Sequence, residues 1–400
     1  MLAVILTKEI RMLAARADQL GTETAFTVLA RAAELAAQGR NIINLGIGQP
    51  DFPTPDHIVE AGMRALKDGA HGYTPSSGVG PLREAVAADL GRRYGTEVKP
   101  RHVQILPGGK VVIFFAAMLT GETGGEILYP DPGFPIYASA VRFSGATPCP
   151  YPLREENDFA FSADDVLSRI TPRTRLIIIN SPANPTGGVT PRAEIEKLVS
   201  GLADHPSVML MSDEIYDRLV FDGAEMTSLL GFPEIRDRLI ILNGWSKTYA
   251  MTGWRLGFAV WPEQMIDAAD RLAVNIHSCV NAAAQEAALA AIEGPQDCVE
   301  DMRRAFSRRA KLLEDGLNAL PGFSCRKPAG AFYAFPNITG TGITSSVLQT
   351  GLLEDAGVAL ISGTSFGDEG EGFLRFSCAN SDEAISTALD RIKDWLGQNT

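Results

Sequence analysis

The chain has 400 residues, of which 45% are hydrophobic and 21% are charged, and its formal net charge is −12. This composition is typical of a soluble globular protein with core for two or three domains, and it excludes the disordered and fibrous classes. The acidic charge argues against a nucleic-acid partner, because phosphate contacts need a concentrated basic face.

Targeting and metal signals are weak in this sequence. The apolar opening at residues 1–6 meets Lys8, Glu9 and Arg11 at once, which makes it too short for a signal core. No run approaches the roughly eighteen apolar residues of a membrane span. The five cysteines lie singly, without CxxC spacing or a histidine cluster, so no metal site is expected. We therefore expect a cytoplasmic protein that does not contact a membrane.

The order of apolar patterns predicts the architecture. Residues 11–40 have helical spacing broken at Gly21, and a Gly/Pro-rich loop follows at residues 45–55. From Val103 onward, short apolar runs alternate with helical patterns, which predicts a buried, mostly parallel sheet covered by helices on both faces. The predicted strands are Val103–Leu106, Glu126–Tyr129, Arg175–Ile179, Val208–Met211, Leu239–Leu242 and Leu256–Val260.

The C-terminal part has a different pattern. Helical spacing predominates from about residue 262 to residue 320. After it, the apolar runs 330–335, 358–361 and 372–376 lie between helical stretches. This arrangement predicts a second, smaller α+β unit.

Three polar segments follow predicted strands. Leu106-Pro-Gly-Gly-Lys110 opens a helix, where glycines and a helix N-terminus can bind an anion, although plain turn chemistry has the same signature. The Pro-rich segment 180–188 can fix the side chain of Asn184, with a cis bond before Pro185, or can be an ordinary turn. Asp213, at a strand end, can pair with a protonated ring nitrogen, with Tyr216 reaching the ring hydroxyl, or it can cap a helix.

Lys247 carries the strongest chemical signal. It lies in a Ser/Gly-rich loop after the strand Leu239–Leu242, and Arg255 follows eight residues later. This arrangement suits an aldehyde cofactor that bears a phosphate, because burial and nearby cations make a lysine amine able to form a Schiff base. The Ser-Lys pair alone would also fit a solvated surface lysine.

Taken together, six motifs occur in a familiar order: Gly-Gly-Lys, Asn-Pro-Thr-Gly, Asp-x-x-Tyr, Ser-Lys, Gly-Trp-Arg-Leu-Gly and Phe-Leu-Arg-Phe-Ser. From about residue 44 to residue 395 the chain closely resembles the class I/II aminotransferases, which are fold type I pyridoxal-phosphate enzymes. The resemblance implies an α/β fold with a mostly parallel seven-stranded sheet in a large domain, residues 45–285. Residues 11–44 and 286–400 would form the small α+β domain. It also implies pyridoxal 5′-phosphate as cofactor and a homodimer with shared active sites.

The resemblance also implies roles for matching residues. Lys247 would form the Schiff base and later move the proton, Asp213 would stabilise the pyridinium, and Arg375 would clamp the substrate α-carboxylate, next to Gly46. Asn184 and Tyr216 would hold the ring oxygen O3′. The residues implied around the phosphate are Gly108, Gly109, Lys110, Ser246 and Arg255, with Tyr73 from the partner subunit.

One position departs from the family pattern. Phe134 stands where the family commonly has a tryptophan stacked on the cofactor ring. Phenylalanine can still stack, but it lacks the indole N–H, so any hydrogen bond from that group to substrate is lost.

The implied reaction is a ping-pong transfer from an L-amino acid to a 2-oxo acid. Lys110 permits aspartate or glutamate as donors with 2-oxoglutarate, since a bacterial subgroup of aspartate aminotransferases uses this lysine for the distal carboxylate; the alternative is a surface charge at a helix start. Residues 271–281 offer no clear second substrate arginine. Alanine, aromatic or basic donors with pyruvate therefore stay open, as does a PLP lyase or decarboxylase of the same fold. A non-catalytic regulator would need a DNA-binding module before residue 44.

Overall fold

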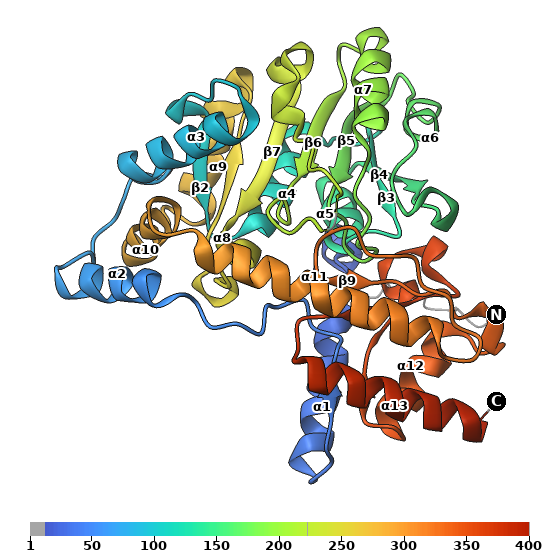
Figure 1. Cartoon of the computed structure of the whole chain (residues 1–400). Coiled ribbons are helices and arrows are strands. Elements are labelled where there is room, and N and C mark those ends of the chain that lie inside the picture. Colours follow the sequence, from blue (N-terminus) through green and yellow to red (C-terminus); the bar gives the residue numbers. More distant parts are fainter. Residues whose placement is uncertain (1–12, 222, 400) are drawn as a thin grey trace, which may run out of the picture.

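A computed structural model describes residues 13–221 and 223–399 (Figure 1). Residues 1–6, and residues 11 and 12 of the predicted first helix, lie outside the described residues. Gly21 interrupts that helix as expected, because a 3-10 turn at Ala15–Gln19 precedes it and the regular helix α1 starts only at Thr24.

A seven-stranded sheet with the order β2-β8-β7-β6-β5-β3-β4 forms the centre of the larger unit. Its neighbouring strands are parallel except around β8, which is antiparallel to both β2 and β7. The six predicted strands and the mostly parallel α/β class are confirmed. The strands are β2 Val103–Leu106, β3 Glu126–Asp131, β4 Thr147–Pro152, β5 Thr174–Asn180, β6 Met209–Asp213, β7 Leu239–Gly244 and β8 Gly257–Val260.

The strand β4 is the one that apolar patterning did not predict. Its sequence is Thr-Pro-Cys-Pro-Tyr-Pro, which has the composition of a loop. It lies at the edge of the sheet and pairs only with β3. An edge strand tolerates proline because one side of the strand needs no N–H donors.

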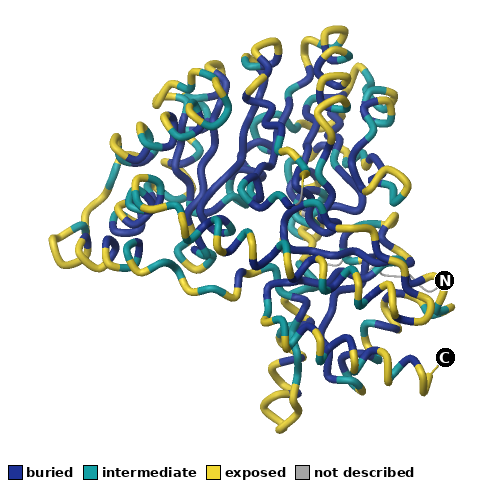
Figure 2. The backbone as a smooth tube through the Cα atoms, in the orientation of Figure 1, coloured by how far each residue is buried: buried dark blue, intermediate teal, exposed yellow. Residues whose placement is uncertain are grey.

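Helices cover both faces of this sheet because its central strands are apolar on both sides. Leu176 and Ile178 pack with helices α4, α5 and α9, whereas Ile177 and Ile179 point to the opposite layer of helices. Figure 2 shows the buried strands in dark blue inside a more exposed shell. The helices are α2 Asp56–Lys67, α3 Gly80–Tyr94, α4 Gly109–Thr120, α5 Ile136–Ser144, α6 Ala163–Leu167, α7 Arg192–Gly201, α8 Trp245–Thr248, α9 Ile266–Ile276 and α10 Ala282–Glu293.

The smaller unit is α+β. The strands β11, β12 and β9 form an antiparallel sheet, and β1 pairs in parallel with β10. Phe306, Phe332 and Ile385 belong to its apolar core, and α11 extends from beside the large unit into it (Figure 1). The division at residues 44 and 285 stays a prediction. The elements are α1 Thr24–Ala37, β1 Ile43–Asn44, α11 Asp297–Asn318, β9 Tyr333–Ala334, α12 Ser345–Glu354, β10 Val358–Ala359, β11 Ile361–Ser362, β12 Leu374–Ser377 and α13 Asp382–Asn399.

The strand register brings the predicted polar segments together. Asn180 at the end of β5 lies opposite Asp213 at the end of β6, and Asp213 lies opposite Leu242 of β7. The segments after these three parallel strands therefore begin at one edge of the sheet, where open α/β folds bind ligands. In the described part of the chain, every helix is too short or too polar to cross a bilayer.

Candidate active site

A cavity of about 490 Å³ lies at this edge of the sheet, between the large and small units. Most of the predicted site residues line it: Gly109, Lys110, Phe134, Asn184, Asp213, Tyr216, Ser246, Lys247, Arg255 and Arg375. The carbonyl oxygen of Gly46 accepts a hydrogen bond from Arg375, and Gly108 lies against the guanidinium of Arg255. Tyr73 does not reach the cavity of its own chain and is 94% exposed.

Lys247 sits in the short helix α8, directly after β7. Its Nζ donates a hydrogen bond to the carbonyl oxygen of Gly48, at 2.5 Å. Burial, together with the positive charges of Arg375 and Arg255, lowers the pKa of this amine to about 8. A larger fraction of the amine is therefore neutral at physiological pH than in a surface lysine, as nucleophilic attack on an aldehyde requires.

Asp213 ends β6 and is buried. Its Oδ2 accepts a hydrogen bond from the hydroxyl of Tyr137 at 2.7 Å, and its Oδ1 accepts one from the backbone N–H of Ile215 at 3.2 Å. Burial raises the pKa of the carboxyl to about 6, although both hydrogen bonds act in the opposite direction. Residues 215–218 form a turn, so Asp213 does not cap a helix.

Tyr137 was not among the predicted site residues. It follows Phe134 by three positions, and the two rings pack edge to face with centroids 5.7 Å apart. Residues three positions apart lie on the same side of a helix. The predicted place of Phe134 at the cofactor ring could therefore have indicated that Tyr137 also faces the site.

Arg375 of β12 is held on three sides. Its Nη1 donates to Oδ1 of Asn184 at 2.9 Å, and its Nη2 donates to the carbonyl oxygen of Gly46 at 2.5 Å. The guanidinium lies over the rings of Tyr333 and Phe366, at 4.5 and 4.7 Å from their centroids. Its buried Nε has no hydrogen-bond partner among the described residues. This fixed, partly unsatisfied cation suits a carboxylate ligand.

Asn184 and Tyr216 face the same cavity. The Asn184–Pro185 bond is cis, as the sequence suggested, and the backbone N–H of Asn184 donates to Oδ1 of Asn180 at 2.9 Å. The hydroxyls of Tyr216 and Tyr333 lie 3.0 Å apart, and burial raises the pKa of Tyr216 well above its usual value. Tyr333 was not predicted, because a tyrosine in an apolar run also fits a core position.

Gly108, Gly109 and Arg255 form a positively polarised corner. Gly108 has φ +96°, and a Cβ at this position would lie 2.3 Å from Nη2 of Arg255. Only glycine permits this approach of the guanidinium to the N-terminus of α4. Ser246 lies nearby in the first turn of α8 and also lines the cavity. Helix N–H groups, a hydroxyl and a guanidinium together match the chemistry of a phosphate ligand.

Lys110 points into the cavity from α4 and forms an ion pair with Glu23, which precedes α1. Its Nζ also lies 5.6 Å from the ring centroids of both Phe26 and Phe134. Glu23 was not predicted, because it lies 87 positions away from Lys110 and no local pattern connects the two residues. Residues 271–281 do not line the cavity.

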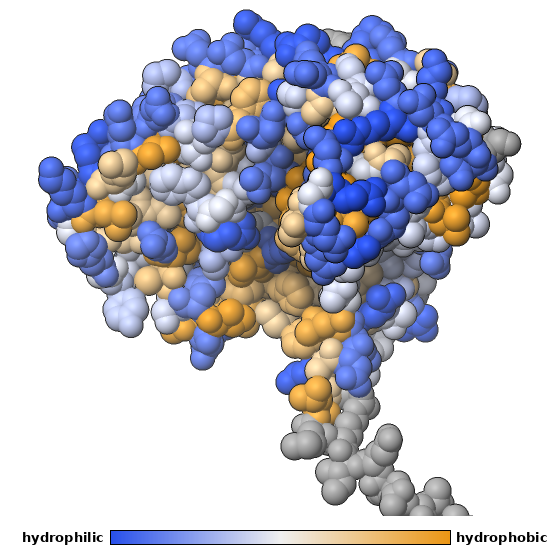
Figure 3. All heavy atoms as spheres, turned by 90° about the horizontal axis from the view of Figure 1, so that it is seen from below, coloured by the Kyte–Doolittle hydropathy of each residue, from blue (hydrophilic) through white to orange (hydrophobic). Residues whose placement is uncertain are grey.

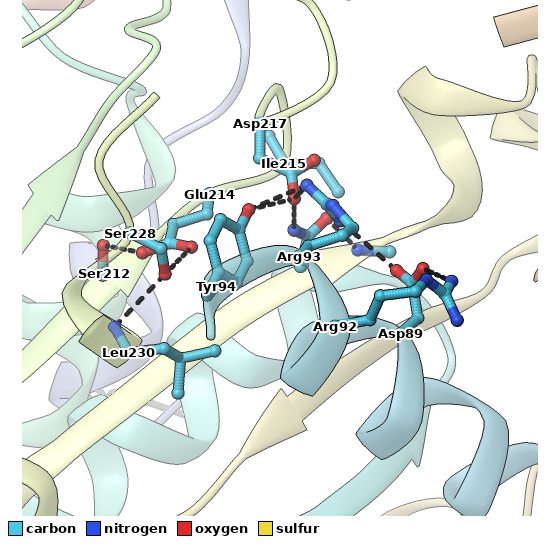
Figure 4. A network of polar contacts seen from close by, with 12 residues as sticks. Asp89, Arg92, Arg93, Tyr94, Ser212, Glu214, Ile215, Asp217, Ser228 and Leu230 are labelled. Atoms are coloured by element: carbon cyan, nitrogen blue, oxygen red, sulfur yellow. Dashed lines mark hydrogen bonds and ion pairs between the residues drawn. The ribbon is translucent and has the colours of Figure 1, made fainter. Parts of the chain in front are cut away.

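A polar network connects the turn after β6 with helix α3 and with the end of β7 (Figure 4). Oδ2 of Asp217 accepts hydrogen bonds from Arg93 at 2.6 Å, Tyr94 at 2.9 Å and Asn243 at 2.8 Å. Asn243 directly precedes Gly244 and accepts a hydrogen bond from its N–H. Asp217 therefore links the turn after β6 to the end of β7, directly before the helix that carries Lys247.

Glu214, the residue after Asp213, holds the same turn in place through its own hydrogen bonds. Its carboxylate accepts hydrogen bonds from Ser212 at 2.9 Å and Ser228 at 2.7 Å (Figure 4). It also accepts one from the N–H of Leu229 at 3.1 Å. Burial raises its pKa to about 7. Residues 213 and 216 thus face the cavity while 214 and 217 fix the turn from behind.

These features fit pyridoxal 5′-phosphate. The cavity offers a buried amine for an aldehyde, a carboxylate for a ring nitrogen and a cradle for a phosphate, where a side chain at Gly108 would intrude. By contrast, no cluster of three or more potential metal ligands occurs in the described ranges.

Comparison with known proteins agrees with this geometry. Residues 40–392 match the family model for class I and II aminotransferases. The chain is 38% identical over 390 residues to an aspartate aminotransferase of Geobacillus stearothermophilus, covering 96% of this chain and 98% of that one. It is 38% identical over 364 residues to aromatic-amino-acid aminotransferase 2 of Thermococcus litoralis, covering 90% and 93%. The solved structure of Thermus thermophilus aspartate aminotransferase with maleate matches with a TM-score of 0.91 and 34% identity, covering 96% and 100%.

Proposed function

Because the chain belongs to the class I and II aminotransferase family, whose members depend on pyridoxal phosphate, we propose that it transfers the amino group of aspartate or glutamate to 2-oxoglutarate. It is a transaminase of the fold type I class. The observation that supports the dicarboxylic substrates is the ammonium group of Lys110, which lies in the same cavity as Arg375 and has no role assigned at the cofactor. Arg375 would bind the α-carboxylate and Lys110 the distal one. The donors named for the Geobacillus and Thermus relatives support the same choice.

The reaction would depend on a few side chains. When bound, pyridoxal phosphate supplies an electron-withdrawing ring that weakens the bonds at the substrate Cα. Lys247 would hold the aldehyde carbon and then, as a neutral amine, take the proton from Cα. Asp213 would keep a proton on the ring nitrogen. Asn184 and Tyr216 would donate hydrogen bonds to the ring oxygen O3′.

The remaining residues would bind and orient. The N–H groups at Gly108, Gly109 and Lys110, with Ser246 and Arg255, would hold the phosphate. Phe134 would pack on the ring face, and its contact with Tyr137 fixes its orientation. Asn184 would also hold Arg375 in place, since the two side chains are hydrogen bonded at 2.9 Å.

Aromatic donors are the second candidate. Phe26 and Phe134 flank Lys110, so the distal end of the cavity is apolar as well as charged. An aromatic side chain can pack there without using the cation. The Thermococcus litoralis relative, at the same identity, is named for aromatic amino acids.

The donor is tested by a stopped-flow panel of the twenty amino acids that follows conversion of the cofactor from its aldehyde to its amine form. We expect aspartate or glutamate among the best donors. Lys110→Gln should weaken dicarboxylic donors by roughly 10- to 100-fold, because a charged hydrogen bond of about 1.5–3 kcal/mol is lost. Alanine, which needs only Arg375, should change far less. Equal losses for both donors, or a panel led by basic amino acids, would reject the dicarboxylic assignment.

We further propose that the enzyme is a homodimer of the cytoplasm. Tyr73 is almost fully exposed, and the large apolar side chains Met63, Leu66, Val274 and Ile276 are between 52% and 65% exposed on α2 and α9. Figure 3 shows that hydrophobic residues also form patches on the face seen from below. Exposed apolar surface of this kind is typical of subunit interfaces. The hydroxyl of Tyr73 would complete the phosphate site of the partner subunit.

Light scattering tests the dimer directly. We expect a mass of about twice 42.9 kDa at assay concentration. Tyr73→Phe should leave the dimer intact and weaken cofactor binding about tenfold, because one hydrogen bond to a charged group is lost. A monomer with full activity would rule out the shared site.

A further inference from the structure

The ion pair between Glu23 and Lys110 lies in the cavity of the candidate site. The Glu23 side chain is only 15% exposed, and Lys110 is 41% exposed. Both residues line the cavity, at the end that also contains Phe26 and Phe134. Exposed ion pairs contribute little, but a partly buried pair in a ligand cavity sets the local charge that a substrate meets.

This end of the cavity is therefore electrically neutral as it stands. An uncharged substrate side chain can pack on Phe26 and Phe134 while Lys110 keeps its partner. A substrate with a distal carboxylate brings a second anion to the same ammonium group. It must displace Glu23 or share Lys110 with it, and the two carboxylates repel each other.

We propose that Glu23 is a specificity-determining residue: an internal carboxylate that occupies Lys110 when the substrate side chain is uncharged and releases it to a dicarboxylic substrate. The inference rests on the proposed function, in which Lys110 meets the distal carboxylate. In a ping-pong transaminase both substrates use one cavity, so a pair that opens and closes lets an uncharged and a dicarboxylic substrate alternate there.

Both partners have the freedom that this exchange needs. Lys110 has a flexible four-carbon stem and three N–H donors, so its ammonium group can turn between two carboxylates. Glu23 occupies the N-cap position of α1, and its side chain makes no capping hydrogen bond. When Lys110 turns away, the N-terminus of this 14-residue helix offers unpaired N–H groups and a positive dipole end to the Glu23 carboxylate.

Inert acids test the proposal without turnover. Calorimetric titration of the holoenzyme would use succinate, which has two carboxylates, and 3-phenylpropanoate, which has one carboxylate and an uncharged ring. In Glu23→Gln we expect succinate to bind about tenfold tighter, because its competitor for Lys110 is gone. We expect 3-phenylpropanoate to bind several-fold weaker, because it leaves Lys110 without a partner.

The matched control is Glu34→Gln, on the same helix. Glu34 pairs with Arg31 at 3.1 Å and its side chain is 63% exposed. It lies in the last turn of α1, whereas Glu23 precedes the first turn. This variant should bind both acids as the wild type does. The single variant Lys110→Gln should weaken succinate more than 3-phenylpropanoate, because only succinate loses the partner of its second carboxylate, which checks the role of the cation independently of Glu23.

An unchanged ratio of the two affinities in Glu23→Gln, or an equal loss for both acids, overturns the proposal. Wild-type enzyme that binds neither acid overturns it as well. Failure of the proposed function is a separate outcome: an enzyme that binds succinate but does not transaminate aspartate or glutamate rejects those donors, while the affinity ratio still decides the role of Glu23.

Discussion

Replacing Lys247 with alanine should lower the rate of transamination by at least about 10⁴-fold, because the same amine attacks the aldehyde and moves the proton. Lys247→Arg should be similarly inactive, since a guanidinium keeps the positive charge but does not deprotonate. Steady-state assays of both variants give the rates. The matched control is Lys197→Ala, a surface lysine paired with Asp164, which should retain wild-type activity.

Chemical labelling tests the same residue in the unmodified enzyme. Borohydride reduction of the holoenzyme followed by peptide mass mapping should place the pyridoxyl group on Lys247. In the apoenzyme, the rate of labelling by added cofactor should rise with pH with a midpoint near 8, where half of the amine is neutral, rather than near its usual 10.5. A label on another lysine contradicts the assignment.

The residues that the sequence could locate are those that follow strands. Asp213 and Lys247 each come directly after an apolar run, and parallel strands deliver their ends to one edge of a sheet. The positions of these two residues after predicted strands were therefore enough to predict that they lie close together. The mostly parallel sheet was predictable for the same reason, whereas β4 was not, since its prolines resemble a loop and only its edge position makes it a strand.

The residues that escaped prediction depend on contacts between distant segments. Glu23 meets Lys110 across 87 positions, and Tyr333 meets Tyr216 across 117 positions. Asp217 is adjacent to a predicted site residue, but its partner Arg93 lies 124 positions earlier. No local pattern encodes such pairs, because they arise only when the small unit and α3 pack against the sheet.

Replacing Asp213 with asparagine should have the second large effect. We expect the change to lower the activity and to raise the stability of the apoenzyme. Asp213→Asn should lower the half-reaction rate by orders of magnitude, because no other described carboxylate lining the cavity except Glu23 could keep the ring nitrogen protonated, and Glu23 is paired with Lys110. Single-turnover absorbance of the cofactor measures this rate. A loss of less than tenfold would mean that Asp213 only supports the turn at residues 215–218.

The apoenzyme should respond in the opposite direction. Folding raises the pKa of Asp213 from 3.8 to about 6, so the folded chain binds this proton more tightly than the unfolded chain. The ionised carboxylate therefore lowers stability as the pH rises through the window from about 4 to 6, by about 3 kcal/mol at pH 8. Asparagine keeps an oxygen for the hydroxyl of Tyr137 but carries no charge.

Apo Asp213→Asn should consequently melt at a higher temperature than the wild-type apoenzyme at pH 8, and the difference should vanish near pH 4. Calorimetric melting curves at the two pH values measure it. The same offset at both pH values would point to altered packing instead of the buried charge. A cationic ring nitrogen opposite Asp213 would offset the cost of burying the carboxylate. The wild-type protein should therefore gain more stability than the variant when the cofactor binds, because the free-energy cost of the buried Asp213 charge is offset only in the holoenzyme.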